Sequence, residues 1–277
     1  MQNTIKLTSK DNYLIKSTHA LHIKKERDAQ NRYLIEGLLL CREALAAGVP
    51  VCQAFTCESF LSKGEGRAFV NQLVEKEIPL YLLPESLLNY CANTESPQGI
   101  LLTAEKSGMQ ISLLEEKIKE SSLLLILDAV MDPGNLGTII RTAKAGGMDA
   151  LILLPGTVDL YNPKVIRSAM GAAFCRSGGF QIIEAASTQD VSRLLQIHNI
   201  KIFTTAADGE SIYGNFELPE PLALVMGAEA AGVSSFWQRQ ADKVLSIPMP
   251  GGGESLNVSV ASGILVYEIL RRKLSGI

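Results

Sequence analysis

The sequence has no apolar run long enough to cross a bilayer, and its first residues lack the apolar core of a secretion signal. Its five cysteines are an odd number without a CxxC pair, and the three histidines form no metal-ligand pattern with them. It also lacks the GxGxxG pattern of a Rossmann dinucleotide site. These absences predict a cytoplasmic protein with reduced thiols, no membrane partner and no metal site.

Charge of neither sign is in large excess, since 26 basic residues face 29 acidic ones and the net charge is −3. The sum does not indicate a nucleic-acid-binding protein, but the distribution of charge matters more. The first stretch is locally basic and interleaved with aromatic residues, so it is either a nucleic-acid-contacting surface or a solvated terminus. The candidates for phosphate contacts there are Lys24, Lys25, Arg27 and Arg32.

Residues 1–104 alternate short apolar-patterned segments with turn residues, which predicts a small α/β module. We expect helices at residues 38–47, 67–76 and 85–91, and strands at 51–57, 79–83 and 99–103. Residues 105–120 are charged and indicate a linker with one short helix.

Residues 121–277 carry a different pattern, beginning with the continuous apolar run 123–127 that is typical of a buried parallel strand. Further strands are expected at 150–154, 201–205, 222–226 and 244–247, and helices at 136–145, 163–174, 191–197, 233–240 and 258–270. Strands alternating with helices predict a doubly wound parallel sheet. Ligands of such sheets bind beyond the carboxyl ends of the strands.

The first motif, residues 132–144, is a Pro-Gly turn that opens a helix. We expect Asn135 to cap this helix. An apolar stripe at 136, 139, 140 and 143 should be buried, which leaves Arg141 on the opposite face. An ordinary strand-to-helix turn with a solvated arginine explains the same pattern.

The second motif, residues 224–232, is a strand that ends at Gly227, followed by Glu229 and Gly232. The third motif, residues 247–268, is a strand end and a glycine loop before Ser255 and Asn257, which open a long apolar helix. Glycines before a helix start let backbone N–H groups approach a small ligand. Each motif alone also fits an ordinary turn with solvated polar residues.

A fourth stretch, residues 162–174, begins with Asn-Pro, which is typical of a helix start. It places Lys164 and Arg167 on one face, where they suit RNA phosphate. A solvated basic face is an equally good interpretation of the charges.

Together, Asn-Leu-Gly with Ile-Arg-Thr-Ala, Gly-x-Glu-x-x-Gly and the third motif resemble the SpoU (TrmH) family of RNA ribose 2'-O-methyltransferases, within the SPOUT superfamily. The resemblance implies a trefoil-knotted parallel-sheet domain at 121–277, a linker at 105–120 and an RNA substrate-binding module at 1–104. It also implies S-adenosyl-L-methionine as cofactor and a homodimer. The apolar surface of the helix at 258–270 agrees with a dimer. Many members carry glycine where this chain has Ala230.

The resemblance also assigns roles to particular residues. The implied catalytic residues are Asn135, Arg141, Glu229, Ser255 and Asn257. The implied cofactor-binding residues are Thr205, Met226, Gly227, Ile247, Met249 and Leu256. Lys164 and Arg167 join the RNA-binding candidates.

The function expected from these residues is methylation of a ribose 2'-OH in structured RNA, with ribosomal RNA favoured. Transfer RNA as substrate, or a non-catalytic RNA-binding protein, are the alternatives. Arg141 stays protonated, so it is a poor literal base. Its expected role is to grip the phosphate beside the target ribose and to stabilise the developing alkoxide, with Asn135 orienting it or the ribose.

Overall fold

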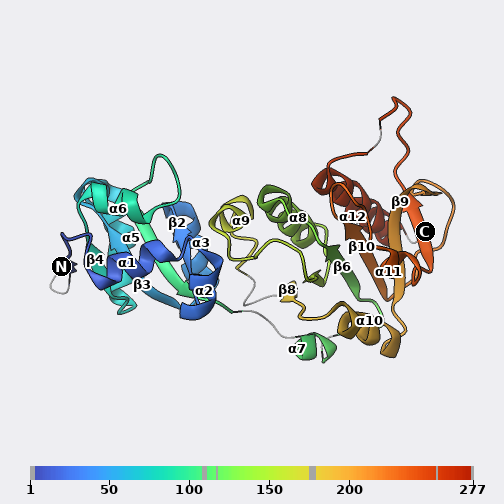
Figure 1. The fold of residues 1–277 in the computed structure, drawn as a ribbon, viewed down its shortest axis with the longest axis horizontal. Helices are drawn as coiled ribbons and strands as arrows, with labels where there is room; N and C mark the ends of the chain where they lie inside the picture. The colour runs from blue at the N-terminus through green and yellow to red at the C-terminus, as the bar shows by residue number, and fades with distance from the viewer. Residues whose placement is uncertain (1–3, 108–110, 117, 175–178, 254, 276–277) are drawn as a thin grey trace. The chain divides into compact units, whose positions relative to one another are not determined.

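The computed structural model describes residues 4–107, 111–116, 118–174, 179–253 and 255–275. The chain divides into two compact units, each with its own sheet (Figure 1). Described residues up to 107, together with 161–174, form the first unit, and the remainder forms the second. Among the described residues, no helix is both long and apolar enough to span a membrane.

The first unit is built on a mixed five-stranded sheet in the order β1-β4-β3-β5-β2. Its strands are β1 (Thr4–Lys6), β2 (Arg32–Glu36), β3 (Val51–Thr56), β4 (Leu80–Leu82) and β5 (Ile100–Glu105). Its helices are α1 (Tyr13–Ala20), α2 (Lys24–Gln30), α3 (Leu38–Ala46), α4 (Glu58–Leu61), α5 (Gly64–Glu75), α6 (Glu85–Cys91) and α9 (Pro163–Ser168). The α/β module predicted at the N-terminus is therefore present.

The basic N-terminal stretch is folded rather than a solvated tail. Asn12 caps α1, because its side chain accepts a hydrogen bond from the backbone N–H of Leu14 at 2.9 Å. Two histidines of this stretch then contact the end of α6, where His19 Nδ1 lies 2.7 Å from the Tyr90 carbonyl and His22 Nε2 lies 3.0 Å from the Cys91 carbonyl. These contacts fasten α1 to the sheet module.

Helix α9 is shorter than the predicted helix at 163–174. It ends at Ser168 because Met170 (φ 47°) and Gly171 (φ 80°) adopt left-handed conformations that a right-handed helix cannot continue. Its buried residues, Val165 and Ile166, belong to the first unit, and the helix packs against β2. A segment from between two strands of the second sheet thus completes the first unit.

The second unit is a six-stranded sheet in the order β11-β9-β10-β6-β7-β8, with every neighbouring pair parallel. Its strands are β6 (Leu123–Asp128), β7 (Ala150–Leu153), β8 (Gln181–Glu184), β9 (Lys201–Ser211), β10 (Leu222–Gly227) and β11 (Lys243–Ser246). Its helices are α7 (Ile111–Glu115), α8 (Pro133–Ala145), α10 (Thr188–Ile197), α11 (Ser235–Gln238) and α12 (Val258–Ser275). The predicted doubly wound parallel sheet is confirmed, and β8 is a strand that the pattern did not predict.

Alternate residues of the central strands face two apolar layers. Leu124 and Ile126 of β6 pack with α10 and with Trp237 of α11 in one core cluster. Helices α8 and α12 pack against each other on the other side of the sheet. Their contact is close, because a Cβ on Gly146 would lie 2.2 Å from a methyl carbon of Val266.

Strand β9 is interrupted by a bulge that shapes the site described next. Thr204 pairs with Val244 of β11, but the next residue of β11, Leu245, pairs with Glu210. Residues 205–209 therefore leave the ladder between these two pairs.

Candidate functional site

Helix α8 is capped by Asp132, not by Asn135 as the sequence pattern predicted. Asp132 Oδ1 accepts from the Asn135 backbone N–H at 2.8 Å, and Pro133 occupies the first turn, where its missing N–H costs nothing. The prediction was wrong because Asp132 and Asn135, on either side of the Pro-Gly pair, are both residue types that cap helices. Asn135 consequently lies inside the first turn, with its side-chain amide available for other partners.

The Asn135 amide joins the three motifs. Its Nδ2 donates to Glu229 Oε1 at 2.8 Å, and its Oδ1 accepts from Asn257 Nδ2 at 3.0 Å. Asn257 is fixed in turn, because its Oδ1 accepts from the backbone N–H and the hydroxyl of Ser259 at 2.9 and 2.6 Å. Glu229 lies 94 positions and Asn257 lies 122 positions after Asn135 in the chain. Hydrogen bonds run in one direction from Asn257 through Asn135 to Glu229.

Glu229 is held as a carboxylate. Partial burial raises the pKa of its carboxyl group, but hydrogen bonds from Asn135 and from the backbone N–H groups of Glu229, Asp132 and Met131 bring that pKa below its ordinary value of 4.5. At neutral pH the group is an acceptor, and it fixes the orientation of the Asn135 amide.

The turn that carries Glu229 has no room for a side chain at Gly227. The backbone of Ala228 and Gly232 exchanges two hydrogen bonds, of 3.1 and 2.9 Å, and folds the turn back onto the end of β10. A Cβ on Gly227 would lie 2.0 Å from the Gly232 carbonyl carbon. The glycine is therefore needed for the close approach of backbone to backbone.

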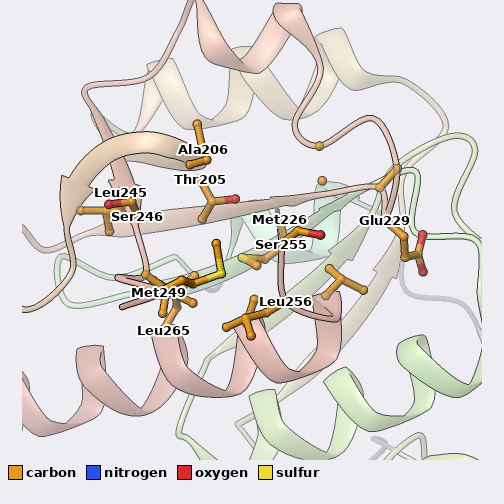
Figure 2. Close-up of a pocket in the computed structure, with 17 residues that line it drawn as sticks. Thr205, Ala206, Met226, Glu229, Leu245, Ser246, Met249, Ser255, Leu256 and Leu265 are labelled. Carbon is orange, nitrogen blue, oxygen red and sulfur yellow. The ribbon is translucent and has the colours of Figure 1, made fainter. Parts of the chain in front are cut away.

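A pocket of about 200 Å³ lies beside this turn, at the carboxyl ends of β10 and β11, next to the bulge of β9 and against α12 (Figure 2). All six residues predicted to bind the cofactor line it, as do Glu229 and Ser255. Its walls are mainly apolar, and the described lining residues offer hydroxyl groups and one carboxylate, that of Glu229. The site therefore suits a small ligand whose apolar parts lie on these walls and whose polar groups meet a few hydroxyls, the carboxylate and the backbone.

Several lining residues were missed from the sequence. They are Ala206, Ala207, Leu245, Ser246, Val258, Ala261 and Leu265. Ala206 and Ala207 lie in the bulge of β9 and reach the pocket because residues 205–209 leave the ladder. Small residues at the end of a strand were the one available signal, and such residues are too common to identify a bulge.

Arg141 lies on the exposed face of α8, and the predicted stripe at 136, 139, 140 and 143 is fully buried. Its guanidinium makes no hydrogen bond or ion pair with any residue that the structure describes. A buried stripe that packs the helix leaves this cation available to an anion.

Five of the six RNA-binding candidates have side chains that reach solvent, and all six belong to the first unit. Lys24 is paired with Asp28 at 2.8 Å, while Lys25 and Lys164 are exposed and Arg32 and Arg167 are half-buried.

Arg27 is the exception. It is 2% exposed, and its Nη1 donates to the carbonyls of Leu21 and His22 at 2.7 and 2.9 Å. A buried guanidinium that binds backbone carbonyls holds the α1–α2 turn and does not reach phosphate, so the RNA-binding prediction does not fit Arg27.

Within the described residues, no group of three or more His, Cys, Asp or Glu side chains could hold a metal ion.

A pocket at the carboxyl ends of parallel strands, beside the hydrogen-bonded side chains of Asn257, Asn135 and Glu229, defines an α/β enzyme that binds its ligand at the strand ends. Residues 122–267 match the SpoU rRNA Methylase family, and residues 12–102 match the MRM3-like substrate binding domain. The chain belongs to the SpoU rRNA methylase family.

Relatives with similar sequences agree with this assignment. The 23S rRNA (guanosine(2553)-2'-O)-methyltransferase RlmP of Bacillus subtilis is 36% identical over 95% of this chain and 98% of its own length. The 23S rRNA (guanosine-2'-O-)-methyltransferase RlmB of Haemophilus influenzae is 34% identical over 78% of this chain and 90% of its own.

Solved structures agree as well. An AdoMet-bound rRNA methyltransferase from Sinorhizobium meliloti, 28% identical, superimposes with a TM-score of 0.83 over 98% of both chains. AviRb from Streptomyces viridochromogenes, in complex with AdoMet, gives 0.83 at 25% identity, over 96% of this chain and 100% of that chain. The predicted family and the predicted α/β fold class, with a substrate-binding module before the catalytic domain, are confirmed.

Proposed function

We propose that this chain transfers the methyl group of S-adenosylmethionine to the ribose 2'-OH of a guanosine in 23S ribosomal RNA. The observation that carries this proposal is the fixed line from Asn257 through Asn135 to Glu229 beside the pocket. The choice of guanosine and of 23S RNA rests on the names of the relatives RlmP and RlmB.

The pocket fits the cofactor in polarity. Apolar walls suit the adenine and the methionine side chain, and Glu229 is ionised, opposite in sign to a sulfonium. Bound there, the cofactor supplies an electrophilic methyl group. The residues proposed to hold it are Thr205, Met226, Gly227, Ile247, Met249 and Leu256.

The remaining site residues act on the ribose. Arg141 pairs with the phosphate next to the target nucleotide and stabilises charge that develops on the 2'-oxygen. Asn135, held by Glu229 and Asn257, presents a fixed amide edge to the ribose or to Arg141. Ser255, whose side chain lines the pocket, shapes the place of methyl transfer. Orientation supplies much of the rate, because the 2'-oxygen would be held beside the methyl group; the transfer would leave S-adenosylhomocysteine, and the 2'-OH proton would pass to water.

The first unit binds the RNA. Lys24, Lys25, Arg32, Lys164 and Arg167 are the proposed phosphate contacts, and Arg27 is left out because it is buried. We keep the proposed boundaries of a module at 1–104, a linker at 105–120 and a catalytic domain at 121–277, and add that α9 packs with the module.

The chain also has a surface suited to self-association. Val260, Tyr267 and Leu274 of α12 are 51%, 50% and 79% exposed, and their spacing of seven residues puts them on one face of the helix. An exposed apolar stripe of this kind supports a homodimer. The resemblance supports two further proposals, a trefoil knot in the catalytic domain and a cytoplasmic location.

The proposal is tested by mapping ribose methylation in RNA with and without this protein, together with transfer of label from S-adenosylmethionine into purified RNA fractions. We expect one new 2'-O-methylguanosine in 23S RNA. Label in transfer RNA alone would overturn the substrate. Tight binding of RNA with no transfer to any fraction would favour a non-catalytic binding protein.

A further inference from the structure

The bulge of β9 forms one wall of the pocket, and its two ends are held in different ways. Before the bulge, residues 201–203 pair with β10 inside the sheet. After it, Glu210 and Ser211 pair only with β11, an edge strand. The position of Thr205, Ala206 and Ala207 therefore depends on what holds the chain beyond Gly209.

Short contacts fix this far end. Ser246 Oγ donates to the Gly209 carbonyl at 2.8 Å, and the Ile212 N–H donates to the Ser246 carbonyl at 2.8 Å. A Cβ on Gly209 would lie 2.7 Å from the Leu245 carbonyl carbon, so the two backbones touch. The bulge is thus pressed against β11 at the point where it rejoins the ladder.

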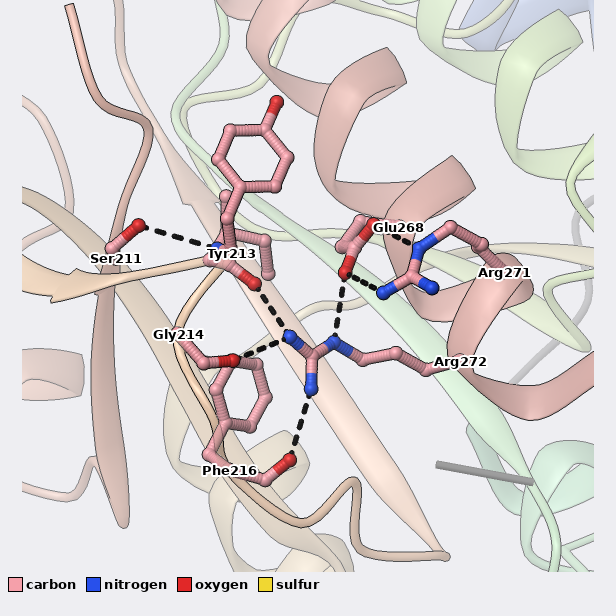
Figure 3. A network of polar contacts seen from close by, with 8 residues as sticks. Ser211, Tyr213, Gly214, Phe216, Glu268, Arg271 and Arg272 are labelled. Carbon is pink, nitrogen blue, oxygen red and sulfur yellow. Dashed lines mark hydrogen bonds and ion pairs between the residues drawn. The ribbon is translucent and has the colours of Figure 1, made fainter. Parts of the chain in front are cut away.

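A buried side chain from another element, Arg272 of α12, contacts the loop that follows at three carbonyls (Figure 3). Its Nη2 donates to the carbonyls of Ile212 and Gly214 at 2.9 and 2.7 Å, and its Nη1 donates to the Phe216 carbonyl at 3.0 Å. Its guanidinium lies 4.0 Å from the centre of the Phe216 ring. Its Nε donates to Glu268, which is 7% exposed, at 2.9 Å.

This arrangement does more than neutralise Glu268. Arg271 already binds both oxygens of that carboxylate at 2.8 Å, with its own side chain 54% exposed. Arg272 differs because three of its N–H donors are used on loop carbonyls, and the contacts to the carbonyls of Ile212 and Phe216 are buried. The same helix, α12, supplies Val258, Ala261 and Leu265 to the pocket. Arg272 therefore connects the loop after the bulge of β9, which forms one wall, to the helix that forms another.

We propose that Arg272 is a positioning residue for the cofactor pocket: by holding residues 212–216 against α12, it keeps the bulge of β9 in the conformation that binds S-adenosylmethionine. The inference rests on the proposed function of this pocket. Without Arg272, three loop carbonyls, two of them buried, lose their donor and the loop moves to reach water. The bulge then samples positions in which the wall is incomplete.

The test compares Arg272→Met and Arg272→Lys with Arg271→Met, a matched control that removes an arginine from the same carboxylate but touches no part of the loop. If about a tenth of the molecules keep the wall in place, the Kd for S-adenosylmethionine rises roughly tenfold in Arg272→Met. Calorimetry gives Kd, and steady-state rates separate KM for S-adenosylmethionine from kcat and from KM for RNA. We expect the rise in KM for S-adenosylmethionine alone, a partial effect in Arg272→Lys and wild-type values in Arg271→Met.

Gly209→Ala is a second variant that disturbs the far end of the bulge without removing a buried charge. Gly209→Ala should also raise the Kd for S-adenosylmethionine. If Arg272→Met does not fold, Gly209→Ala and Arg272→Lys provide the test. Unchanged cofactor affinity in Arg272→Lys and Gly209→Ala, or an equal loss in Arg271→Met, would overturn the inference. A wild-type protein that binds no S-adenosylmethionine would instead overturn the proposed function.

Discussion

Both polar atoms of the Asn135 side chain, Nδ2 and Oδ1, take part in hydrogen bonds. A glutamate accepts from its NH₂ group and a second asparagine donates to its oxygen, so the amide has one orientation that satisfies both partners. A neighbouring cation with no partner among the described residues, Arg141, lies on the same helix. The site thus combines a rigid polar edge with a charge that is free to meet a substrate.

Arg141→Ala should leave the fold and the affinity for S-adenosylmethionine nearly unchanged, because the helix is packed by other residues. Turnover should fall by about a hundredfold or more, the usual cost of losing one preorganised group that stabilises developing charge. Arg141→Lys should recover part of this loss, since a point charge cannot replace a planar fork on phosphate. Single-turnover rates with saturating RNA measure the effect. Wild-type rates in Arg141→Ala would remove the residue from the mechanism.

Glu229→Gln should change the pH dependence of stability. The pKa of Glu229 is lower in the folded protein than its ordinary value of 4.5, so its ionised form stabilises the fold. That contribution is complete above 4.5 and is lost as the pH falls through the lowered pKa. Urea midpoints of wild type and Glu229→Gln should therefore differ more at about pH 7 than at about pH 3. The effect is small because the side chain is exposed, and an equal difference at both pH values would contradict it.

At the scale of elements, the turn after β10 depends on a glycine at its first position. Gly227→Ala should abolish binding of S-adenosylmethionine and lower the free energy of unfolding by about 1–3 kcal/mol, because a Cβ at 2.0 Å from backbone forces the turn open. Gly179→Ala is the matched control, since it lies in the same unit away from the pocket and a Cβ there meets nothing within 4 Å. Calorimetry and urea unfolding measure both variants. Retained binding in Gly227→Ala would show that the turn adapts.

The sequence predicts regular elements well and their exceptions poorly. Strand β6 is a continuous apolar run, and that run is enough to place a buried parallel strand. The bulge of β9 could not be predicted, because it depends on pairing with β11, which lies more than thirty positions further along the chain. The cap of α8 and the end of α9 depend on backbone conformations at single residues, and several residue types at each place fit the local pattern.

The candidate site was predictable for a different reason. Its residues lie at strand ends, and the carboxyl ends of parallel strands meet at one edge of the sheet. The partners of Asn135 could not be read from the sequence, since the hydrogen bonds join distant turns. The prediction for Arg27 failed for another reason. The basic composition of its segment indicated a surface residue, but its long side chain turns inward and donates to backbone carbonyls.

At the scale of the molecule, the first unit should bind RNA mainly through charge. Lys25→Ala should weaken RNA binding about equally for different sequences and reduce the slope of log affinity against log salt by about 1, because one phosphate contact is lost. Lys63→Ala, in the same unit but outside the proposed contacts, is the control. Filter binding at several salt concentrations measures the slopes. An unchanged slope in Lys25→Ala would reassign that residue.

The exposed stripe of α12 should hold two copies of the chain together. Val260→Asp with Tyr267→Glu should convert a dimer into a monomer, because each change places a charge in an apolar contact. Leu39→Asp, at an exposed leucine of α3, should leave the dimer intact. Light scattering at micromolar concentration gives the mass of each variant, and a wild-type monomer would contradict the proposal.

The long separation of the site's residues also sets when activity can begin during synthesis. Asn135 and Asn257 are 122 positions apart, which at roughly 5–20 residues per second corresponds to about 6–24 s of translation. A growing chain that has not reached Asn257 lacks both the amide that holds Asn135 and the helix that closes the pocket. We therefore expect a nascent chain to be inactive toward RNA until α12 has been synthesised and has docked against the pocket.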